Sequence, residues 1–216
     1  MPESQHIPYT ATTRLPSGPV LVLAPHPDDE VFGCGGAILT HRAAGQTVTV
    51  VVVTDGGHGG DAAYVALRRQ ESRAAAALLG YGGPIFWGLP DRGLVYGEQL
   101  VQQIQHQIVA CAAQVVYAPS PWEVHPDHLA LAYATLEAVR RQGDGINLLL
   151  YEVGAPLRPN LLLDLTPHWA TKQAAMQCFP SQLAKQAYDT HIAALNRYRT
   201  YTLPSAVVAA EAFYQL

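Results

Sequence analysis

The chain has 216 residues, of which 49% are hydrophobic and 14% charged, and its formal net charge is -4. This composition is typical of a folded globular protein and unlike that of a disordered one, so we expect a single domain over residues 1–216. The basic residues are few and scattered, which argues against a nucleic-acid partner. Three cysteines are too few for a disulfide framework. Without a secretory signal or an apolar stretch long enough to span a membrane, we expect a cytoplasmic protein.

Short apolar runs alternate with helical segments along the first 153 residues. Residues 19–25 (PVLVLAP) and 47–56 (TVTVVVVTDG) have the composition of buried strands. Between them, carboxylates at the front and Gly45 at the back are start and stop signals of a helix. A strand, a helix and a second strand in this order predict a parallel crossover. The pattern continues with predicted helices over residues 64–79, 99–113 and 128–141 and predicted strands over residues 83–89, 114–120 and 146–153.

The pattern changes beyond residue 154. Residues 160–166 predict one more strand, which we place at an edge of the sheet, and residues 168–195 are largely helical. The aromatic and apolar tail that follows would be costly to leave in water, so it should pack onto its own domain or across an interface in a homo-oligomer. The predicted fold class is therefore α/β, a Rossmann-like, open and mostly parallel sheet with flanking helices. In such folds ligands bind beyond the carboxyl ends of the strands.

Two segments with ligand-type side chains follow predicted strands at that end of the sheet. They are PHPDDE at residues 25–30 and EVHPDH at residues 123–128. A catalytic zinc needs three histidine or carboxylate ligands and one open position. His26 and Asp29 are three residues apart, close enough to bind one ion, and a histidine from the second segment would complete the set. Such a set suits Zn²⁺, and Fe²⁺ or Co²⁺ would also fit.

A purely structural role explains only part of the first segment. Asp28 and Asp29 can cap the following helix, and HPDH can be a turn followed by a helix start. Capping does not explain why Asp28, Asp29 and Glu30 are adjacent, because their repulsion costs energy unless a cation or the helix dipole offsets it. We therefore favour a metal site.

The two segments resemble the motifs of the PIG-L/LmbE superfamily of zinc-dependent N-deacetylases. The resemblance extends over most of the chain and includes TDG at residues 54–56, R-x-x-E at 68–71, LPD at 89–91 and the final AEAFYQL. It implies a hydrolase that removes the N-acetyl group from an N-acetylglucosamine-type sugar or conjugate. It also implies that His26, Asp29 and His128 bind zinc and that Asp28 is the general base for zinc-activated water.

The same resemblance implies further roles at the second segment and around it. A protonated His125 stabilises the oxyanion and Asp127 orients its imidazole, while either His125 or the general base protonates the departing amine. Arg68 lies near sugar or phosphate oxygens, with a surface charge on a helix as the alternative. Asp91 accepts sugar hydroxyls or sits in a turn. Glu123 stands where some family members have a tyrosine, and we expect it to contact a hydroxyl or the amine product.

Other functions remain to be weighed against a sugar deacetylase. A zinc amidase acting on a larger acyl or thiol-conjugate amide would use the same metal site. A nucleotide-binding module without metal chemistry would require a glycine-rich turn after the first strand, where this chain has carboxylates that repel a pyrophosphate. A non-catalytic member of the superfamily is disfavoured because all the expected catalytic side chains are present. His58, in the glycine-rich stretch at residues 56–61, is expected in a loop that closes over substrate more than as a metal ligand.

Overall fold

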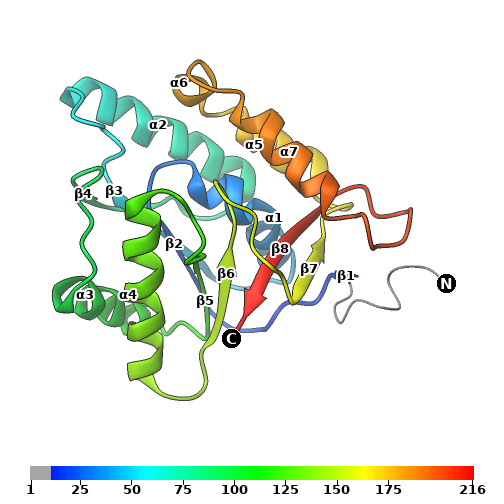
Figure 1. Ribbon diagram of the computed structural model, residues 1–216, viewed down its shortest axis with the longest axis horizontal. Helices are drawn as coiled ribbons and strands as arrows, with labels where there is room; N and C mark the ends of the chain where they lie inside the picture. Colours follow the sequence, from blue (N-terminus) through cyan, green and yellow to red (C-terminus); the bar gives the residue numbers. More distant parts are fainter. Residues whose placement is uncertain (1–10) are drawn as a thin grey trace.

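The strands form one open sheet at the centre of the molecule (Figure 1). A computed structural model describes residues 11–216, and within them the eight strands lie in the order β1-β7-β8-β6-β5-β2-β3-β4. Every pairing is parallel except the two made by β8, so the predicted fold class is confirmed. The strands are β1 (Ala11–Thr12), β2 (Val20–Ala24), β3 (Val48–Thr54), β4 (Ile85–Leu89), β5 (Val115–Pro119), β6 (Asn147–Tyr151), β7 (Leu161–Asp164) and β8 (Ala210–Gln215).

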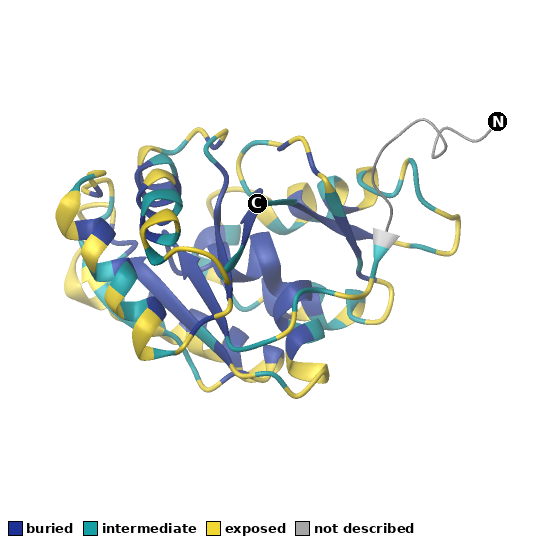
Figure 2. Ribbon diagram, turned by 90° about the horizontal axis from the view of Figure 1, so that it is seen from below, coloured by how far each residue is buried: buried dark blue, intermediate teal, exposed yellow. Residues whose placement is uncertain are grey.

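Helices cover both faces of this sheet, and Figure 2 shows the strands buried beneath helices with exposed outer surfaces. The helices α3 and α4 pack on one face, and α1, α2, α5 and α7 pack on the other. No helix among residues 11–216 is long and apolar enough to cross a membrane. The helices are α1 (Asp29–Ala43), α2 (Ala62–Leu79), α3 (Glu98–Ala110), α4 (Pro126–Gln142), α5 (Trp169–Met176), α6 (Pro180–Leu183) and α7 (Tyr188–Tyr198).

Strand β2 shows why both faces need a cover. Its five residues are all buried, with Val20 and Val22 in the core under α1 and α2 and with Leu21 and Leu23 in the core under α3 and α4. Successive side chains of a strand point to opposite faces, so an unbroken apolar run is stable only between two helical layers. The apolar runs of the sequence therefore account for the three-layer architecture.

The strand order reverses beside β2, and this reversal creates the place for a site. β2 pairs with β3 on one side and with β5 on the other. The chain thus proceeds through β3 and β4 in one direction and through β5 and β6 in the other. The loops that leave β2 and β5 diverge at their carboxyl ends, where open α/β sheets form a crevice for ligands.

The C-terminal part differs from the sequence prediction in two ways. The predicted strand at residues 160–166 is β7, but it is not an edge strand, because β1 and β8 pair on its two sides. The predicted helical region breaks at Pro180, since a proline lacks the N–H that a continuous helix needs. The tail packs onto its own domain, as expected, and it does so as β8 between β6 and β7.

Helix α1 bends at Cys34, whose φ of -144° and ψ of 24° are not helical. The bend leaves backbone N–H groups at the start of the second half of the helix without helical partners. Glu211 on β8 accepts those of Gly36 at 2.7 Å and Ala37 at 2.8 Å. A carboxylate at a helix N-terminus is favourable, so the last strand of the chain caps the first long helix.

A buried lysine completes this junction. The Nζ of Lys172 on α5 donates to Glu211 at 2.7 Å, to the carbonyl oxygen of Phe32 at 3.0 Å and to Asn196 at 2.9 Å. Lys172 has no exposed surface, and each of its three donors is used. The C-terminal segments therefore fix both halves of the bent helix that begins with Asp29.

Candidate metal and catalytic site

The two ligand-rich segments meet at the carboxyl end of the sheet. PHPDDE forms the turn between β2 and α1, and HPDH forms the N-terminus of α4 after β5. Asp28 has a φ of 147°, which non-glycine residues rarely adopt, and its backbone N–H donates to Glu30 at 3.0 Å. A costly backbone conformation that neighbouring side chains maintain is a common feature of functional sites.

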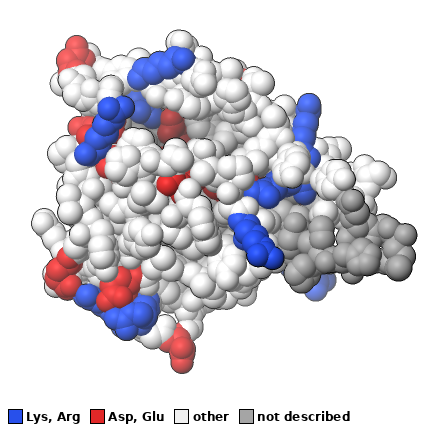
Figure 3. All heavy atoms as spheres, viewed as in Figure 1, with Lys and Arg blue, Asp and Glu red and all other residues white. Residues whose placement is uncertain are grey.

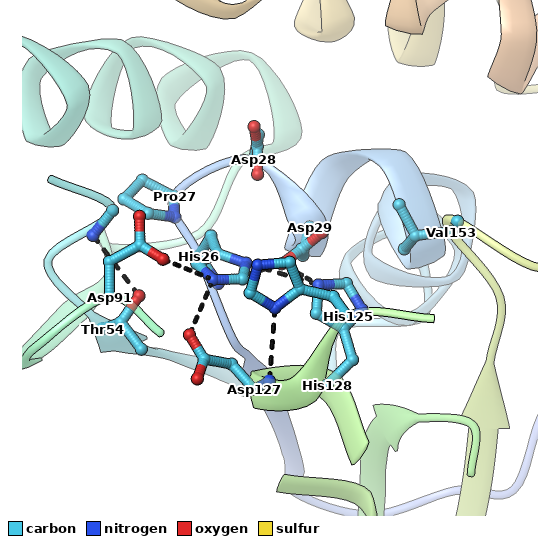
Figure 4. Close-up of polar contacts among 12 residues, drawn as sticks. His26, Pro27, Asp28, Asp29, Thr54, Asp91, His125, Asp127, His128 and Val153 are labelled. Atoms are coloured by element: carbon cyan, nitrogen blue, oxygen red, sulfur yellow. Dashed lines mark hydrogen bonds and ion pairs between the residues drawn. The ribbon is translucent and has the colours of Figure 1, made fainter. Parts of the chain in front are cut away.

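Three side-chain atoms form a nearly equilateral triangle (Figure 4). Oδ2 of Asp29 lies 3.1 Å from Nδ1 of His26 and 3.1 Å from Nε2 of His128, and the two nitrogens are 3.3 Å apart. A tetrahedral zinc with ligand atoms at about 2.0 to 2.1 Å requires separations of about 3.3 Å between those atoms. The triangle matches one face of such a tetrahedron, so these three residues fit a metal ion.

Each histidine of the triangle has its second nitrogen beside a carboxylate. Nε2 of His26 lies 3.1 Å from Asp127, and Nδ1 of His128 lies 3.3 Å from Glu123. A carboxylate that accepts the N–H of a ligand histidine fixes the tautomer and leaves the other nitrogen free for the metal. Asp127 therefore selects the nitrogen that His26 presents to the triangle, while Glu123 faces Nδ1 of His128 as an ion-pair partner without a hydrogen bond.

Asp127 lies elsewhere than the sequence analysis predicted. Its side chain contacts His26, and its oxygens also accept the backbone N–H groups of Arg92 at 2.7 Å and Leu94 at 3.1 Å. It makes no side-chain hydrogen bond to His125, which instead accepts the backbone N–H of Asp127 at 3.2 Å. We therefore assign Asp127 to the orientation of His26.

Among residues 11–216, ligand-type side chains form two further groups, and within each group the ligand atoms lie within 4.8 Å of one another. Both groups include His26. They are His26 with His125 and His128, and His26 with Asp91, His125 and Asp127. In the second group, however, Asp127 is fully buried and its oxygens already accept two backbone N–H groups and the imidazole of His26. The orienting role accounts for it without a second ion.

Charges within the triangle stabilise one another. Burial alone would raise the pKa of Asp29, but the imidazoles of His128 and His26 hold it well below its ordinary value. Burial alone would lower the pKa values of the two histidines. Hydrogen bonds to Asp127 and Asp29 nevertheless raise that of His26 well above its ordinary value, and Asp29 and Glu123 raise that of His128 to about 9. The carboxylates around the triangle thus favour positive charge at its two imidazoles.

Asp28 is adjacent to the triangle without belonging to it, and Figure 4 shows it apart from the other carboxylates. Burial raises the pKa of Asp28 to about 7, although the nearby Arg68 opposes the shift. A carboxyl group with a pKa near neutrality can both take and return a proton at physiological pH. Neighbouring Glu30 also has its pKa raised to about 7 by burial, but it is engaged by Ser72 and lies farther into the protein.

Arg68 holds Asp28 in place. Its guanidinium donates to Asp28 at 2.8 Å and to the carbonyl oxygens of Pro27 at 2.5 Å and Gly56 at 3.0 Å. Only 5% of its side chain is exposed. The sequence analysis placed this guanidinium near substrate oxygens; in the structure its hydrogen bonds go to Asp28 and to the loops that follow β2 and β3.

His125 is positioned to donate a hydrogen bond as a neutral group. Burial and the nearby His26 and His128 lower its pKa, which disfavours the protonated form expected from the sequence. Because its Nδ1 accepts the N–H of Asp127, the neutral ring carries its hydrogen on Nε2. This N–H remains available to an oxyanion.

Glu123 and Asp91 have roles that the sequence did not reveal. The oxygens of Glu123 accept the N–H groups of Val153 at 2.7 Å and Gly154 at 2.9 Å, so they are occupied rather than free for substrate. Asp91 contacts Nε2 of His26 at 3.4 Å and accepts the N–H of His58 at 2.9 Å. Burial would raise the pKa of Asp91, but the hydrogen bond to His26 lowers it to about 2.

A cavity of about 400 Å³ opens onto the triangle. This volume is within the usual range for small-molecule sites. His58 lines this cavity but belongs to neither alternative ligand group. The opposite wall comes from α6 and α7 and their connection, through Gln182, Lys185 and Tyr188. The sequence analysis did not identify these three residues as part of the site. The one available signal was their spacing of three, which would place them on one side of a helix.

The sequence model of the PIG-L family, described as GlcNAc-PI de-N-acetylase, matches residues 21–139. This range is more than half of the chain and contains both ligand-rich segments. The chain belongs to the PIG-L family. The family includes deacetylases that depend on a metal ion, and the triangle of His26, Asp29 and His128 could hold one.

Solved structures share the whole fold with this PIG-L chain. The conserved protein TT1542 from Thermus thermophilus is 26% identical over 92% of this chain and 94% of its own, with a TM-score of 0.79. The N,N'-diacetylchitobiose deacetylase from Pyrococcus horikoshii is 25% identical over 91% of this chain and 83% of its own, also with a TM-score of 0.79. The 4-carboxy-2-hydroxymuconate hydratase GalB from Pseudomonas putida KT2440 is 24% identical over 93% of this chain and 96% of its own, with a TM-score of 0.75. At this identity the similarity shows the fold alone.

Proposed function

We propose that this PIG-L protein is a zinc-dependent N-deacetylase that releases acetate from an N-acetylglucosamine-type sugar or conjugate. The observation that carries the proposal is the three-atom triangle of His26, Asp29 and His128, with separations of 3.1 to 3.3 Å, beside the buried carboxyl group of Asp28. Fe²⁺ or Co²⁺ would suit the same donor set.

A divalent metal bound by the triangle would supply a Lewis acid that activates water and polarises the acyl carbonyl. Asp28 takes the proton that the attacking water loses, because its raised pKa makes it a competent base near pH 7. The Nε2–H of neutral His125 donates to the oxygen that becomes negative as the carbonyl carbon turns tetrahedral. When the C–N bond breaks, Asp28 returns its proton to the amine. Arg68 keeps the Asp28 carboxylate in position throughout.

The relatives support the class of reaction. The family description names a GlcNAc-PI de-N-acetylase, and a solved relative at 25% identity is a deacetylase of N,N'-diacetylchitobiose. Both names contain an N-acetylglucosamine unit as the group from which acetyl is removed. We therefore assign that unit to the inner end of the cavity, nearest to the metal triangle.

The test is release of acetate from N-acetylglucosamine, N,N'-diacetylchitobiose and charged N-acetylglucosamine derivatives by protein with one equivalent of Zn²⁺. We expect turnover of at least one member of this panel, its loss after treatment with a chelator, and its return on addition of Zn²⁺. A parallel panel with longer N-acyl groups distinguishes the amidase, which would release the longer acids faster than acetate. Full activity in chelator-treated protein with no bound metal would contradict the proposal.

A further inference from the structure

Asp28, the proposed general base, has a backbone conformation that needs support. Its φ of 147° and ψ of -31° lie in a region that a residue with a Cβ rarely adopts. Its own side chain makes no capping hydrogen bond to the helix that follows. The direction of the Asp28 carboxylate therefore depends on contacts from other residues that hold the backbone beside it.

The peptide unit between Pro27 and Asp28 is held at both of its polar ends. Its carbonyl oxygen, on Pro27, accepts a hydrogen bond from the guanidinium of Arg68 at 2.5 Å. Its N–H, on Asp28, donates to Oε2 of Glu30 at 3.0 Å. Because the peptide unit is planar and its rotation changes φ of Asp28, the two contacts together oppose a change of that angle.

Glu30 is in turn fixed by Ser72 on α2. The hydroxyl of Ser72 donates to Oε1 of Glu30 at 2.5 Å, while Oε2 accepts the N–H of Asp28. A planar carboxyl group with both oxygens engaged cannot rotate without breaking one of these hydrogen bonds. Ser72 and Glu30 have no exposed surface, so water does not stand ready to replace either partner.

Arg68 and Ser72 act from one face of the same helix. They are four residues apart on α2, so their side chains lie one turn apart on the same side. Arg68 reaches the carbonyl oxygen of the peptide unit directly, and Ser72 reaches its N–H through Glu30. Helix α2 thus holds both ends of the peptide unit that precedes the general base.

Helix capping alone does not account for Glu30. An acidic residue in the first turn of a helix is favourable even when it remains in water, whereas burying a carboxyl group costs free energy. Charged side chains are sparse even on the face of the molecule in Figure 3, yet Glu30 is completely buried. The two hydrogen bonds that Glu30 accepts offset part of this cost, and one of them comes from the general-base residue.

Resting on the deacetylase function proposed above, we infer that Ser72 and Glu30 are positioning residues for the general base. Neither lines the cavity, so neither meets the substrate. Glu30 fixes the peptide unit that precedes Asp28, Ser72 fixes Glu30, and the Asp28 carboxylate is thereby directed into the cavity. Loss of either contact should slow the chemical step while substrate and metal binding stay in place.

The first measurement compares kcat, KM and bound zinc in the wild type and in Ser72→Ala, with the best substrate of the acetate-release panel. We expect kcat to fall about tenfold or more, with KM within about twofold of the wild type, because a small displacement of a reacting group costs rate more than binding. Both proteins should hold zinc equally. The matched control is Thr135→Val, which removes an equally buried hydroxyl from α4 and should leave kcat and KM unchanged.

Two substitutions at Glu30 separate its position from its charge. In Glu30→Gln the amide oxygen still accepts the N–H of Asp28 and the amide NH₂ donates to Ser72, whereas Glu30→Met keeps the length of the side chain and offers neither. We expect kcat of Glu30→Gln to exceed that of Glu30→Met by about tenfold, since the methionine leaves the Asp28 N–H buried without a partner. An equally severe loss of kcat in both variants would assign Glu30 a role through its charge and overturn the inference.

Amide hydrogen exchange in the metal-free protein tests the same contacts without turnover. NMR follows exchange of the Asp28 N–H together with that of Val22, in the buried strand β2. We expect the Asp28 amide to exchange about tenfold faster in Ser72→Ala than in the wild type, with Val22 unchanged, because only the turn is loosened. Faster exchange of both amides would indicate general destabilisation and would overturn the positioning role.

The possible results separate this inference from the function on which it rests. An unchanged kcat in Ser72→Ala, or a fall in kcat that follows loss of zinc, would overturn the inference and leave the deacetylase intact. No acetate from any substrate with the zinc-loaded wild type would count against the deacetylase. The exchange rate of the Asp28 amide would then still decide whether Ser72 and Glu30 hold the turn.

Discussion

The candidate metal ligands and one wall of the cavity come from different regions of the chain. Residues 21–139, which the PIG-L family model matches, contain the metal triangle, Asp28, His125 and the carboxylates that orient them. The region after residue 139 contains none of these groups. It supplies β8, the junction that holds the bend of α1, and the cavity wall with Lys185. The candidate metal and base residues therefore lie in the region that the family model matches, and one wall of the cavity lies outside it.

The division is not complete, because α1 depends on both regions. Its first turn carries Asp29, while its bend is fixed by Glu211 and Lys172 from the C-terminal region. The segment with His26 and Asp29 is therefore short and continuous in sequence, but the helix that begins with Asp29 is held by contacts from the far end of the chain. The predictions below test how far each region depends on the other.

The largest expected effect on stability is at the buried ion pair. Lys172→Met leaves the carboxylate of Glu211 buried without its cation, and removing one partner of such a pair typically costs about 3 to 5 kcal/mol. Urea denaturation followed by circular dichroism measures the free energy of unfolding. Arg158→Gln, at an exposed arginine, should stay within about 0.5 kcal/mol of the wild type.

A double substitution sharpens this result. Lys172→Met combined with Glu211→Gln removes both charges, so it should be less destabilising than the single lysine substitution. If Lys172→Met alone costs less than about 1 kcal/mol, the junction is not the support of α1 that the contacts indicate.

The next largest effect concerns the carboxylate that orients His128. Glu123→Gln should weaken metal binding by about 10- to 100-fold, or about 1.4 to 2.7 kcal/mol. Loss of a carboxylate that lies against a metal-binding histidine typically lowers metal affinity by this factor. Competition with a chromophoric chelator measures the affinity directly. Glu98→Gln, at an exposed glutamate on α3, should bind metal as the wild type does. An unchanged affinity in Glu123→Gln would place this residue outside the metal site.

The smallest effect is a pH dependence away from the site. His41 is buried against the hydroxyl of Tyr117 at 2.8 Å, and burial lowers its pKa. The unfolded chain, with an imidazole pKa near 6.5, then binds a proton at a higher pH than the folded one. The contribution of neutral His41 to the free energy of unfolding is therefore complete above about pH 6.5. It declines as the pH falls from the pKa of His41 in the unfolded chain toward its lower pKa in the folded protein.

The measurement is the difference in unfolding free energy between pH 7 and pH 5 for the wild type and for His41→Gln. The variant should lose less stability over this interval, whatever its stability at pH 7. An identical loss in both proteins would show that His41 does not titrate differently in the folded and unfolded states.

The sequence predicted the parallel core well because its signals are local. Valine-rich runs that end at proline or at Asp55–Gly56 became β2, β3 and β5, and Gly80 ends α2 in the left-handed conformation that favours glycine. The strand β8 was missed because buried and exposed residues do not alternate along it. Its place between β6 and β7 is set by pairing with segments distant in sequence.

The candidate ligands were also accessible from the sequence, whereas the supporting contacts were not. Spacing brought His26 and Asp29 together and placed a histidine of HPDH opposite them. It could not show which ring nitrogen faces the triangle, nor that Asp127 turns toward His26 and Glu123 toward His128. Those contacts depend on side-chain rotamers and on loops that only the folded sheet brings within reach.

The central claim is that Asp28 acts in the chemistry while the triangle alone binds the metal. The most direct test measures bound zinc and acetate release together in the wild type and in Asp28→Asn, which keeps the size of the side chain. We predict one zinc per chain in both proteins and a fall in kcat of about 10²- to 10⁴-fold in the variant, the usual contribution of a general base. Loss of zinc along with activity would make Asp28 a ligand, and undiminished kcat with zinc bound would contradict its role as the base.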